Sequence, residues 1–119
     1  RIFNNLLKNA LQSIPEGRNG KVEVVIRSQE NAAIAEVRDN GSGIPAEVRE
    51  SIFEPNFTTK SSGMGLGLAM VKRMVEQAHG TVRFETTEDR GTTFVVTLPL
   101  HPEADTFAVV IPGLTLDRE

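Results

Sequence analysis

No cysteine occurs among the 119 residues, which excludes disulfide bridges and thiolate metal sites and is typical of a reducing compartment. No apolar run approaches the roughly 20 residues that a membrane-spanning helix needs, and no charged-then-apolar signal segment opens the chain. We therefore expect this part of the protein to be soluble and cytoplasmic, with no membrane contact of its own. A membrane anchor elsewhere in a longer parent protein would not contradict this expectation.

Neither sign of charge is in large excess. The formal net charge is −3 at pH 7, which argues against a surface for nucleic acid or for a membrane. Between Glu54 and Glu76, however, the chain has no acidic residue, whereas Lys60, Lys72 and Arg73 are basic. This stretch favours an acidic ligand such as a phosphate group.

Histidine is scarce, with two residues in the chain. His79 precedes a glycine at an expected helix end, and His101 follows the last expected core strand. Neither has a recognisable partner, so no Ser-His-Asp set can be assembled. Surface and helix-end roles are favoured for both.

The length fits one domain with a single two-layer core. We assign residues 1–100 to this domain and residues 101–119 to a C-terminal tail. In the tail, residues 106–111 (TFAVVI) are β-prone and predict an extra strand, added to the domain's own sheet or to a neighbouring molecule. The alternative is a disordered tail. The chain begins without methionine and inside a helical pattern, which suggests a piece of a longer protein.

Hydrophobic periodicity predicts an α+β fold. Helical spacing of apolar residues predicts helices over residues 2–14 and 68–75, the second closed by His79 and Gly80, and Pro45 favours a short helix over residues 46–52. Alternating, β-branched patterns predict strands over residues 21–27, 33–38, 81–86 and 92–98, the first two of them antiparallel neighbours. We expect a two-layer α/β sandwich, in which helices cover one face of a mostly antiparallel sheet.

Four short motifs follow one another along the chain. They are residues 5–10 (NLLKNA), 39–45 (DNGSGIP), 53–60 (FEPNFTTK) and 63–68 (GMGLGL). In the first motif, Asn5 and Asn9 are four residues apart and therefore share a helix face, where their amide oxygens suit Mg²⁺ that also binds substrate phosphates. The alternative is a polar helix face that contacts only water.

The second motif places Asp39 at the end of a strand, before two glycines. A carboxylate there can accept a hydrogen bond from an exocyclic amine such as that of adenine, Gly41 and Gly43 let the backbone approach a flat ligand, and Ile44 would pack on the base. A calcium loop fails, because glycines stand at the third and fifth ligand positions. An ordinary Asp-Asn-Gly turn is the remaining alternative.

The last two motifs predict a lid and a phosphate site. Gly63, Gly65 and Gly67 match neither the dinucleotide fingerprint nor the P-loop, but they lead into a helix whose free N–H groups favour phosphate. The residues before them are rich in glycine, serine and threonine and indicate a lid, with Phe53 and Phe57 as apolar anchors at its root. Together the four motifs predict ATP as the ligand.

At these residues the sequence resembles the catalytic and ATP-binding domain of two-component sensor histidine kinases, within the superfamily that also holds the gyrase and MutL ATPases. The resemblance covers residues 1–100, and its lid is similar to that of the nitrogen-regulation subgroup. The four motifs look like the N box, first glycine box, F box and second glycine box, and residues 91–94 (GTTF) like the closing Gly-Thr-x-Phe. The resemblance implies the Bergerat ATP-binding fold.

Carried over residue by residue, the resemblance implies Asn9 on Mg²⁺ with Asn5 close by, and Asp39 on the adenine amine. It also implies Gly43 beneath the base and Thr92 supporting Asp39 through water. The remaining positions in the implied ATP site, most of them near the phosphates, are Lys8, Gln12, Gly41, Ile44, Thr58, Thr59, Lys60, Gly65, Leu66, Gly67 and Leu68. Gln12 stands where many family members carry a basic residue, so one phosphate contact would be neutral here.

The implied function is that of a protein-histidine kinase lobe, which presents the γ-phosphate of ATP to a histidine on a separate dimerisation and phosphotransfer domain, with a response regulator downstream. Asn5 is the candidate catalytic position, but its amide cannot act as a general base, unlike the glutamate of the hydrolysing relatives. This difference favours phosphoryl transfer over the alternative, an ATP-hydrolysing conformational switch. A degenerate interaction module is a third alternative, against which the four intact motifs argue.

Overall fold

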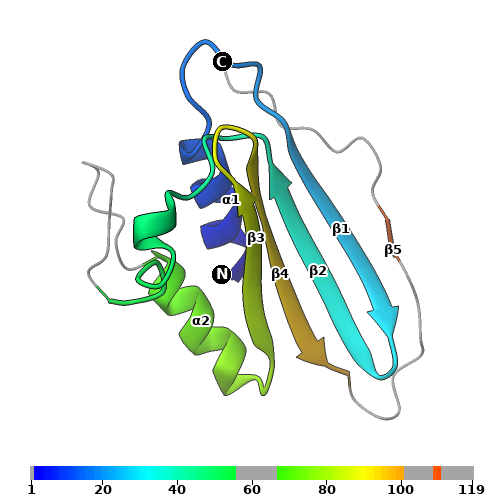
Figure 1. Ribbon diagram of the computed structural model, residues 1–119. Helices are drawn as coiled ribbons and strands as arrows, with labels where there is room; N and C mark the ends of the chain where they lie inside the picture. Colours follow the sequence, from blue (N-terminus) through cyan, green and yellow to red (C-terminus); the bar gives the residue numbers. More distant parts are fainter. Residues whose placement is uncertain (1, 56–66, 101–108, 111–119) are drawn as a thin grey trace.

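The computed structural model describes residues 2–55, 67–100 and 109–110, and these form two layers (Figure 1). In chain order the elements are α1 (Ile2–Gln12), β1 (Val22–Gln29), β2 (Ala32–Asp39), the 3₁₀ helix η1 (Ala46–Val48), α2 (Gly67–Gln77), β3 (Thr81–Thr87), β4 (Gly91–Pro99) and β5 (Val109–Val110). The sheet order is β3-β4-β2-β1-β5, and every neighbouring pair is antiparallel. Both α-helices lie on one face of this sheet. The expected α+β sandwich is confirmed.

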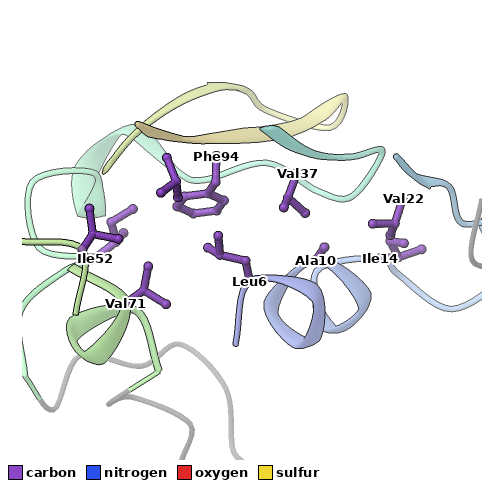
Figure 2. Packing of buried hydrophobic residues seen from close by; sticks show 10 residues of the cluster. Leu6, Ala10, Ile14, Val22, Val37, Ile52, Val71 and Phe94 are labelled. Carbon is purple, nitrogen blue, oxygen red and sulfur yellow. The ribbon is translucent and has the colours of Figure 1, made fainter. Parts of the chain in front are cut away.

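Alternation along the strands decides which face meets the helices. In the register of the sheet, Val37 on β2 lies opposite Phe94 on β4, which lies opposite Phe84 on β3. Helix spacing supplies the other half of the core: Leu6 and Ala10 are one turn apart on α1, as Val71 and Val75 are on α2. Figure 2 shows Leu6, Ala10 and Val71 pointing toward the sheet. The buried cluster comprises Leu6, Ala10, Ile14, Val22, Val37, Ile52, Val71, Val75, Phe94 and Val96. Each large member contributes about 1.5–3 kcal/mol through burial.

The β1–β2 hairpin has the tightest connection in the sheet. Its two turn residues, Glu30 and Asn31, have φ values of 50° and 65°. Positive φ at both positions gives a turn whose twist matches that of the flanking strands. The register of β1 and β2 follows from this turn and brings Val22 opposite Asp39.

The short helix expected over residues 46–52 is only partly present. A single 3₁₀ turn, η1, is followed by turns in which Ser51 N donates to Val48 O and Glu54 N to Ser51 O, each at 2.9 Å. These are bonds between residues three apart, the tighter pattern of short helical pieces. Ile52 is 3% exposed and packs into the core, so the turns serve to bury it.

Helix α2 ends at the expected place, but the left-handed residue of its cap is not the expected glycine. Gly80 N donates to Val75 O at 2.9 Å and His79 N to Glu76 O at 3.0 Å, which is the pattern of a Schellman cap. The left-handed residue is His79, with φ 64°, and not the glycine. Gly80 is needed for another reason, since a Cβ there would lie 2.3 Å from Thr97 O.

Part of the C-terminal tail pairs with the sheet. Val109 lies opposite Ile26 and Val110 opposite Val25, so β5 extends the sheet beside β1 (Figure 1). The rest of the strand expected over residues 106–111 lies outside the described residues. None of the helices in the described ranges is long and apolar enough to cross a membrane.

The sheet face away from the helices carries a buried carboxylate. Glu36 is 9% exposed, and its two oxygens contact Arg27 Nη1 at 2.7 Å and Arg38 Nη2 at 2.6 Å. Arg38 also contacts Glu23 at 3.4 Å. The hydrogen bond from Arg27, aided by Arg38, lowers the pKa of Glu36 below its usual 4.5, although burial opposes this.

Replacing Glu36 by glutamine should lower the free energy of unfolding at pH 7 by about 1–2 kcal/mol, because the charge-assisted hydrogen bonds from Arg27 and Arg38 weaken. A lowered folded-state pKa means that this contribution is present above pH 4.5 and is lost as the pH falls through the folded-state value. Urea unfolding at pH 7 and at about pH 3 should therefore show the two proteins converging in acid.

The control is Glu85→Gln, which removes one exposed ion pair with Arg83 on the same sheet face. Such pairs are worth little, so its stability should change by less than about 0.5 kcal/mol at either pH. A Glu36→Gln difference that stays constant from neutral to acidic pH would contradict the role given to this ion pair.

Candidate functional site

Asp39 is the last residue of β2 and faces the helix layer. Its Oδ1 accepts hydrogen bonds from Gly41 N at 2.9 Å and from Thr92 N at 3.2 Å, and Oδ2 is buried as well. The two backbone donors come from different segments, the loop that follows β2 and the start of β4. They hold the carboxylate in one orientation at the end of the sheet.

A pair of threonine hydroxyls lies beside Asp39. Thr92 is 5% exposed, and its Oγ1 lies 2.9 Å from Thr86 Oγ1 on the neighbouring strand. Thr86 Oγ1 donates to Gly91 O at 3.1 Å and accepts from Ile44 N at 2.9 Å. Because a hydroxyl has a single proton, Thr92 must be the donor to Thr86. Direct support of Asp39 by Thr92 thus comes from its backbone N–H.

The loop of residues 39–44 is held by hydrogen bonds to its backbone. Ser42 N donates to Ser13 O at 3.0 Å, and Ser42 O accepts from Asp89 N at 2.7 Å. At the end of the loop, Ile44 O accepts from Arg49 Nε at 3.0 Å. The partners belong to the segment that follows α1, the β3–β4 turn and the segment after η1, so three parts of the chain fix this loop.

The two glycines of the loop are required by the protein's own packing. A Cβ at Gly41 would lie 2.6 Å from Ser13 O, and a Cβ at Gly43, which has φ +76°, would lie 2.4 Å from Thr87 O. A side chain at either position would collide with backbone. These close approaches require glycine at both positions even when no ligand is bound. The access to a flat base that the sequence predicts would be a second reason for the same glycines.

Helix α1 places Asn5 and Asn9 at the border of its buried face. Asn5 and Asn9 are half-buried, whereas Lys8 and Gln12 are exposed. The described residues contain no group of three histidine, aspartate or glutamate side chains that could hold a metal ion. A cation at this helix would therefore rely on amide oxygens and on the oxygens of a ligand, which is how Mg²⁺ commonly binds nucleotides.

The second glycine motif is described only from Gly67, the first residue of α2. Leu68 is half-buried and packs against the core, and the first turn carries no acidic residue to oppose a phosphate. Other site residues from the sequence lie outside the described part of the chain. These are Thr58, Thr59, Lys60, Gly65 and Leu66.

Phe53 anchors the segment that leads toward these residues. Its ring centroid lies 6.0 Å from that of Phe84 and 6.3 Å from that of Phe94, and Lys72 Nζ lies over the Phe53 ring, 5.9 Å from its centroid. Aromatic pairs at such spacings are favourable beyond their burial. The apolar packing expected for Phe53 is confirmed. Its role at the root of a lid stays a prediction, because Phe57 and the residues after it, up to Leu66, lie outside the described residues.

Sequence reasoning missed three residues that shape the site: Thr86, Arg18 and Arg49. The signal for Thr86 was its place on the inward-facing side of β3, after Val82 and Phe84, where a polar residue needs a partner. The sequence gives no comparable signal for the two arginines, because both bind backbone carbonyl groups, which every residue has. For Arg18 these carbonyl groups are also distant in the sequence.

Comparison with known proteins gives consistent matches. The family model for "Histidine kinase-, DNA gyrase B-, and HSP90-like ATPase" matches residues 1–102. Sporulation kinase A of Bacillus subtilis is 37% identical over 99 residues, and sensor histidine kinase ZraS of Escherichia coli K12 is 40% identical over 101 residues. These matches cover 83% and 85% of this chain but only 16% and 21% of the two relatives.

A solved structure supports the same comparison. The catalytic domain of histidine kinase ThkA superposes with a TM-score of 0.73 at 33% identity, over 86% of this chain and 66% of that one. The fold and the sequence motifs therefore agree.

Gly43→Ala should destabilise the protein much more than Gly17→Ala. Both glycines have positive φ, +76° and +87°, so both alanines carry about 1–2 kcal/mol of backbone strain. At Gly17 nothing lies within 4 Å of a Cβ, whereas at Gly43 the collision with Thr87 O adds a further loss of about 1–3 kcal/mol. Urea unfolding of both variants measures the difference, and equal losses would show that the loop does not pack on the β3–β4 turn.

Proposed function

Because the chain belongs to the family of histidine kinase-, DNA gyrase B- and HSP90-like ATPases, we propose that it is the ATP-binding catalytic lobe of a sensor histidine kinase. In this proposal it binds ATP with Mg²⁺ and presents the γ-phosphate to a histidine on a separate dimerisation domain. The chain spans only a small part of the length of its relatives, which leaves room for that domain elsewhere in a parent protein.

The observation that carries the proposal is the position of Asp39. Its carboxylate is oriented by Gly41 N and Thr92 N at the end of a strand, on the helix side of the sheet. A fixed acceptor of this kind matches the exocyclic amine of adenine. Ile44, which is partly buried against the core, would supply apolar contact to the base.

The phosphates would lie toward α1 and the start of α2. Lys8 is an exposed cation on α1, and the N–H groups of the first turn of α2 are available to an anion. Asn9 would bind Mg²⁺ through its amide oxygen, with Asn5 close by. Charge neutralisation and placement of the γ-phosphate are the catalytic contribution that such a lobe makes.

Transfer is favoured over hydrolysis by the composition of α1. This helix, residues 2–12, contains no carboxylate, so it offers no general base that could activate water for attack on the γ-phosphate. Neither histidine of the chain is a convincing acceptor: His79 ends α2 in the left-handed conformation, and His101 lies outside the described residues. The acceptor histidine would come from the separate domain, and a response regulator would receive the phosphoryl group next.

ATP with Mg²⁺ should raise the melting temperature of this chain, because a ligand at a hundredfold excess over Kd stabilises the native state by roughly 2.7 kcal/mol. Asp39→Asn should remove most of that shift by replacing the acceptor of the adenine amine. Asp89→Asn is the matched control, since it deletes an equal charge in the exposed β3–β4 turn. Wild-type affinity of the Asp39→Asn variant in calorimetry would disprove the assignment.

Adding EDTA should weaken ATP binding strongly in the wild type and only slightly in Asn9→Ala, because the proposed role of Asn9 depends on the metal. Asn4→Ala is the control, an exposed asparagine on the same helix, and it should lose as much affinity on chelation as the wild type. Titrations with and without EDTA give the comparison. Equal losses in all three proteins would remove Asn9 from the metal site.

A further inference from the structure

The connection between α1 and β1, residues 13–21, lies directly against the 39–44 loop, and Arg18 is at the centre of the contact. Arg18 Nη1 lies 2.8 Å from Asn40 O and 2.8 Å from Gly41 O. Two successive carbonyl groups therefore accept hydrogen bonds from one guanidinium nitrogen. Bonds from a charged donor are roughly twice as strong as bonds between neutral groups.

The first of these bonds acts on the peptide group that also contacts Asp39. Asn40 O and Gly41 N belong to one planar peptide unit, so Arg18 binds its oxygen end while Asp39 Oδ1 accepts from its nitrogen end. Rotation of this plane would break both bonds at once. A positive donor on the oxygen also polarises the unit and strengthens donation by the N–H.

The next peptide unit is held in the same way. Its oxygen, Gly41 O, accepts from Arg18, and its nitrogen, Ser42 N, donates to Ser13 O at 3.0 Å. Arg18 and Ser13 belong to the same connection, which continues directly from α1. The orientation of the base-binding loop is thereby tied to the helix that carries the asparagines.

The side chain of Asn40 completes the attachment. Its Oδ1 accepts from Lys21 N at 2.7 Å, its Nδ2 donates to Asn19 O at 2.9 Å, and its backbone N donates to Lys21 O at 3.2 Å. These bonds hold the backbone that directly follows Arg18 against the loop. The guanidinium is therefore presented to the two carbonyls by a fixed segment.

We propose that Arg18 is a positioning residue for adenine recognition: through the Asn40–Gly41 peptide it keeps Asp39 oriented toward the base, without contacting the nucleotide. This inference rests on the proposed function, because it assigns Arg18 to the same site. It differs from a general structural role, which would affect unfolding but not the affinity of the folded protein. The inference predicts that affinity falls equally for a ligand with phosphates and for one without them, because only the contact with the base is weakened.

The experiment compares Arg18→Gln, Arg18→Lys and Arg83→Gln in calorimetric titrations with adenosine and with ADP plus Mg²⁺. Arg83 is the matched control, an arginine on the opposite sheet face whose described ion pair is with Glu85. Titrations are run well below the melting temperature of each variant. Amide hydrogen exchange of the ligand-free proteins is measured in parallel.

Arg18→Gln should raise the Kd for adenosine and for ADP by the same factor, about tenfold, because the fraction of molecules with a correctly oriented carboxylate falls. Arg18→Lys retains a charged donor and should recover to within about threefold of the wild type. Arg83→Gln should bind both ligands like the wild type. Exchange should accelerate at Gly41 and Ser42 in Arg18→Gln, with the strand amides of β2 and β4 unchanged.

Unchanged affinity of Arg18→Gln, a loss shared by Arg83→Gln, or a loss seen for ADP but not for adenosine would each overturn the inference. If Arg18→Gln does not fold, Arg18→Lys decides: because an ammonium lacks the planar fork of the guanidinium, it replaces Arg18 only in part, and exchange at Gly41 and Ser42 should still be faster than in the wild type. Exchange there that equals the wild type, or acceleration across the whole sheet, overturns the inference. Absence of binding in the wild type would instead reject the proposed function, and the exchange rates would still report on the peptide orientation.

Discussion

The register between β2 and β4 is the constraint on which the site depends. It places Val37 opposite Phe94 in the core and Asp39 opposite Thr92 at the end of the same face. A shift of β2 by one residue would turn Asp39 to the outer face and would also expose Val37, which is 1% exposed in the structure. Burial of the core therefore secures the position of a carboxylate that would be costly to desolvate without defined partners.

Around this carboxylate, backbone groups of the 39–44 loop are hydrogen-bonded within the protein. Donors and acceptors from the α1–β1 connection, the β3–β4 turn and the segment after η1 contact it. Gly41 and Gly43 permit this approach, because a side chain at either would collide with neighbouring backbone. A loop ordered before binding spares the ligand the entropic cost of ordering it, and this favours affinity for a small, flat base.

The features that follow from local pattern could be predicted from the sequence, and those that depend on distant partners could not. Alternating apolar residues predicted the four long strands, and helical spacing of apolar residues predicted both α-helices. Asp39 was identified as a site residue because it ends a predicted strand and precedes two glycines. The left-handed His79 and the 3₁₀ turns of η1 were missed, since both depend on how neighbouring residues pack. Thr86 and Arg18 were missed because Ile44 and Asn40, to which they bond, are 42 and 22 positions away in the chain.

The most direct test of the account is a nuclear magnetic resonance titration of the isotope-labelled chain, first with adenosine and then with ADP plus Mg²⁺. The account predicts that adenosine shifts the amide signals of Gly41, Ile44 and Thr92, and that the phosphates and the metal add shifts at Asn9 on α1. Shifts confined to the outer sheet face around Glu36, or no shifts in the 39–44 loop with either ligand, would contradict it.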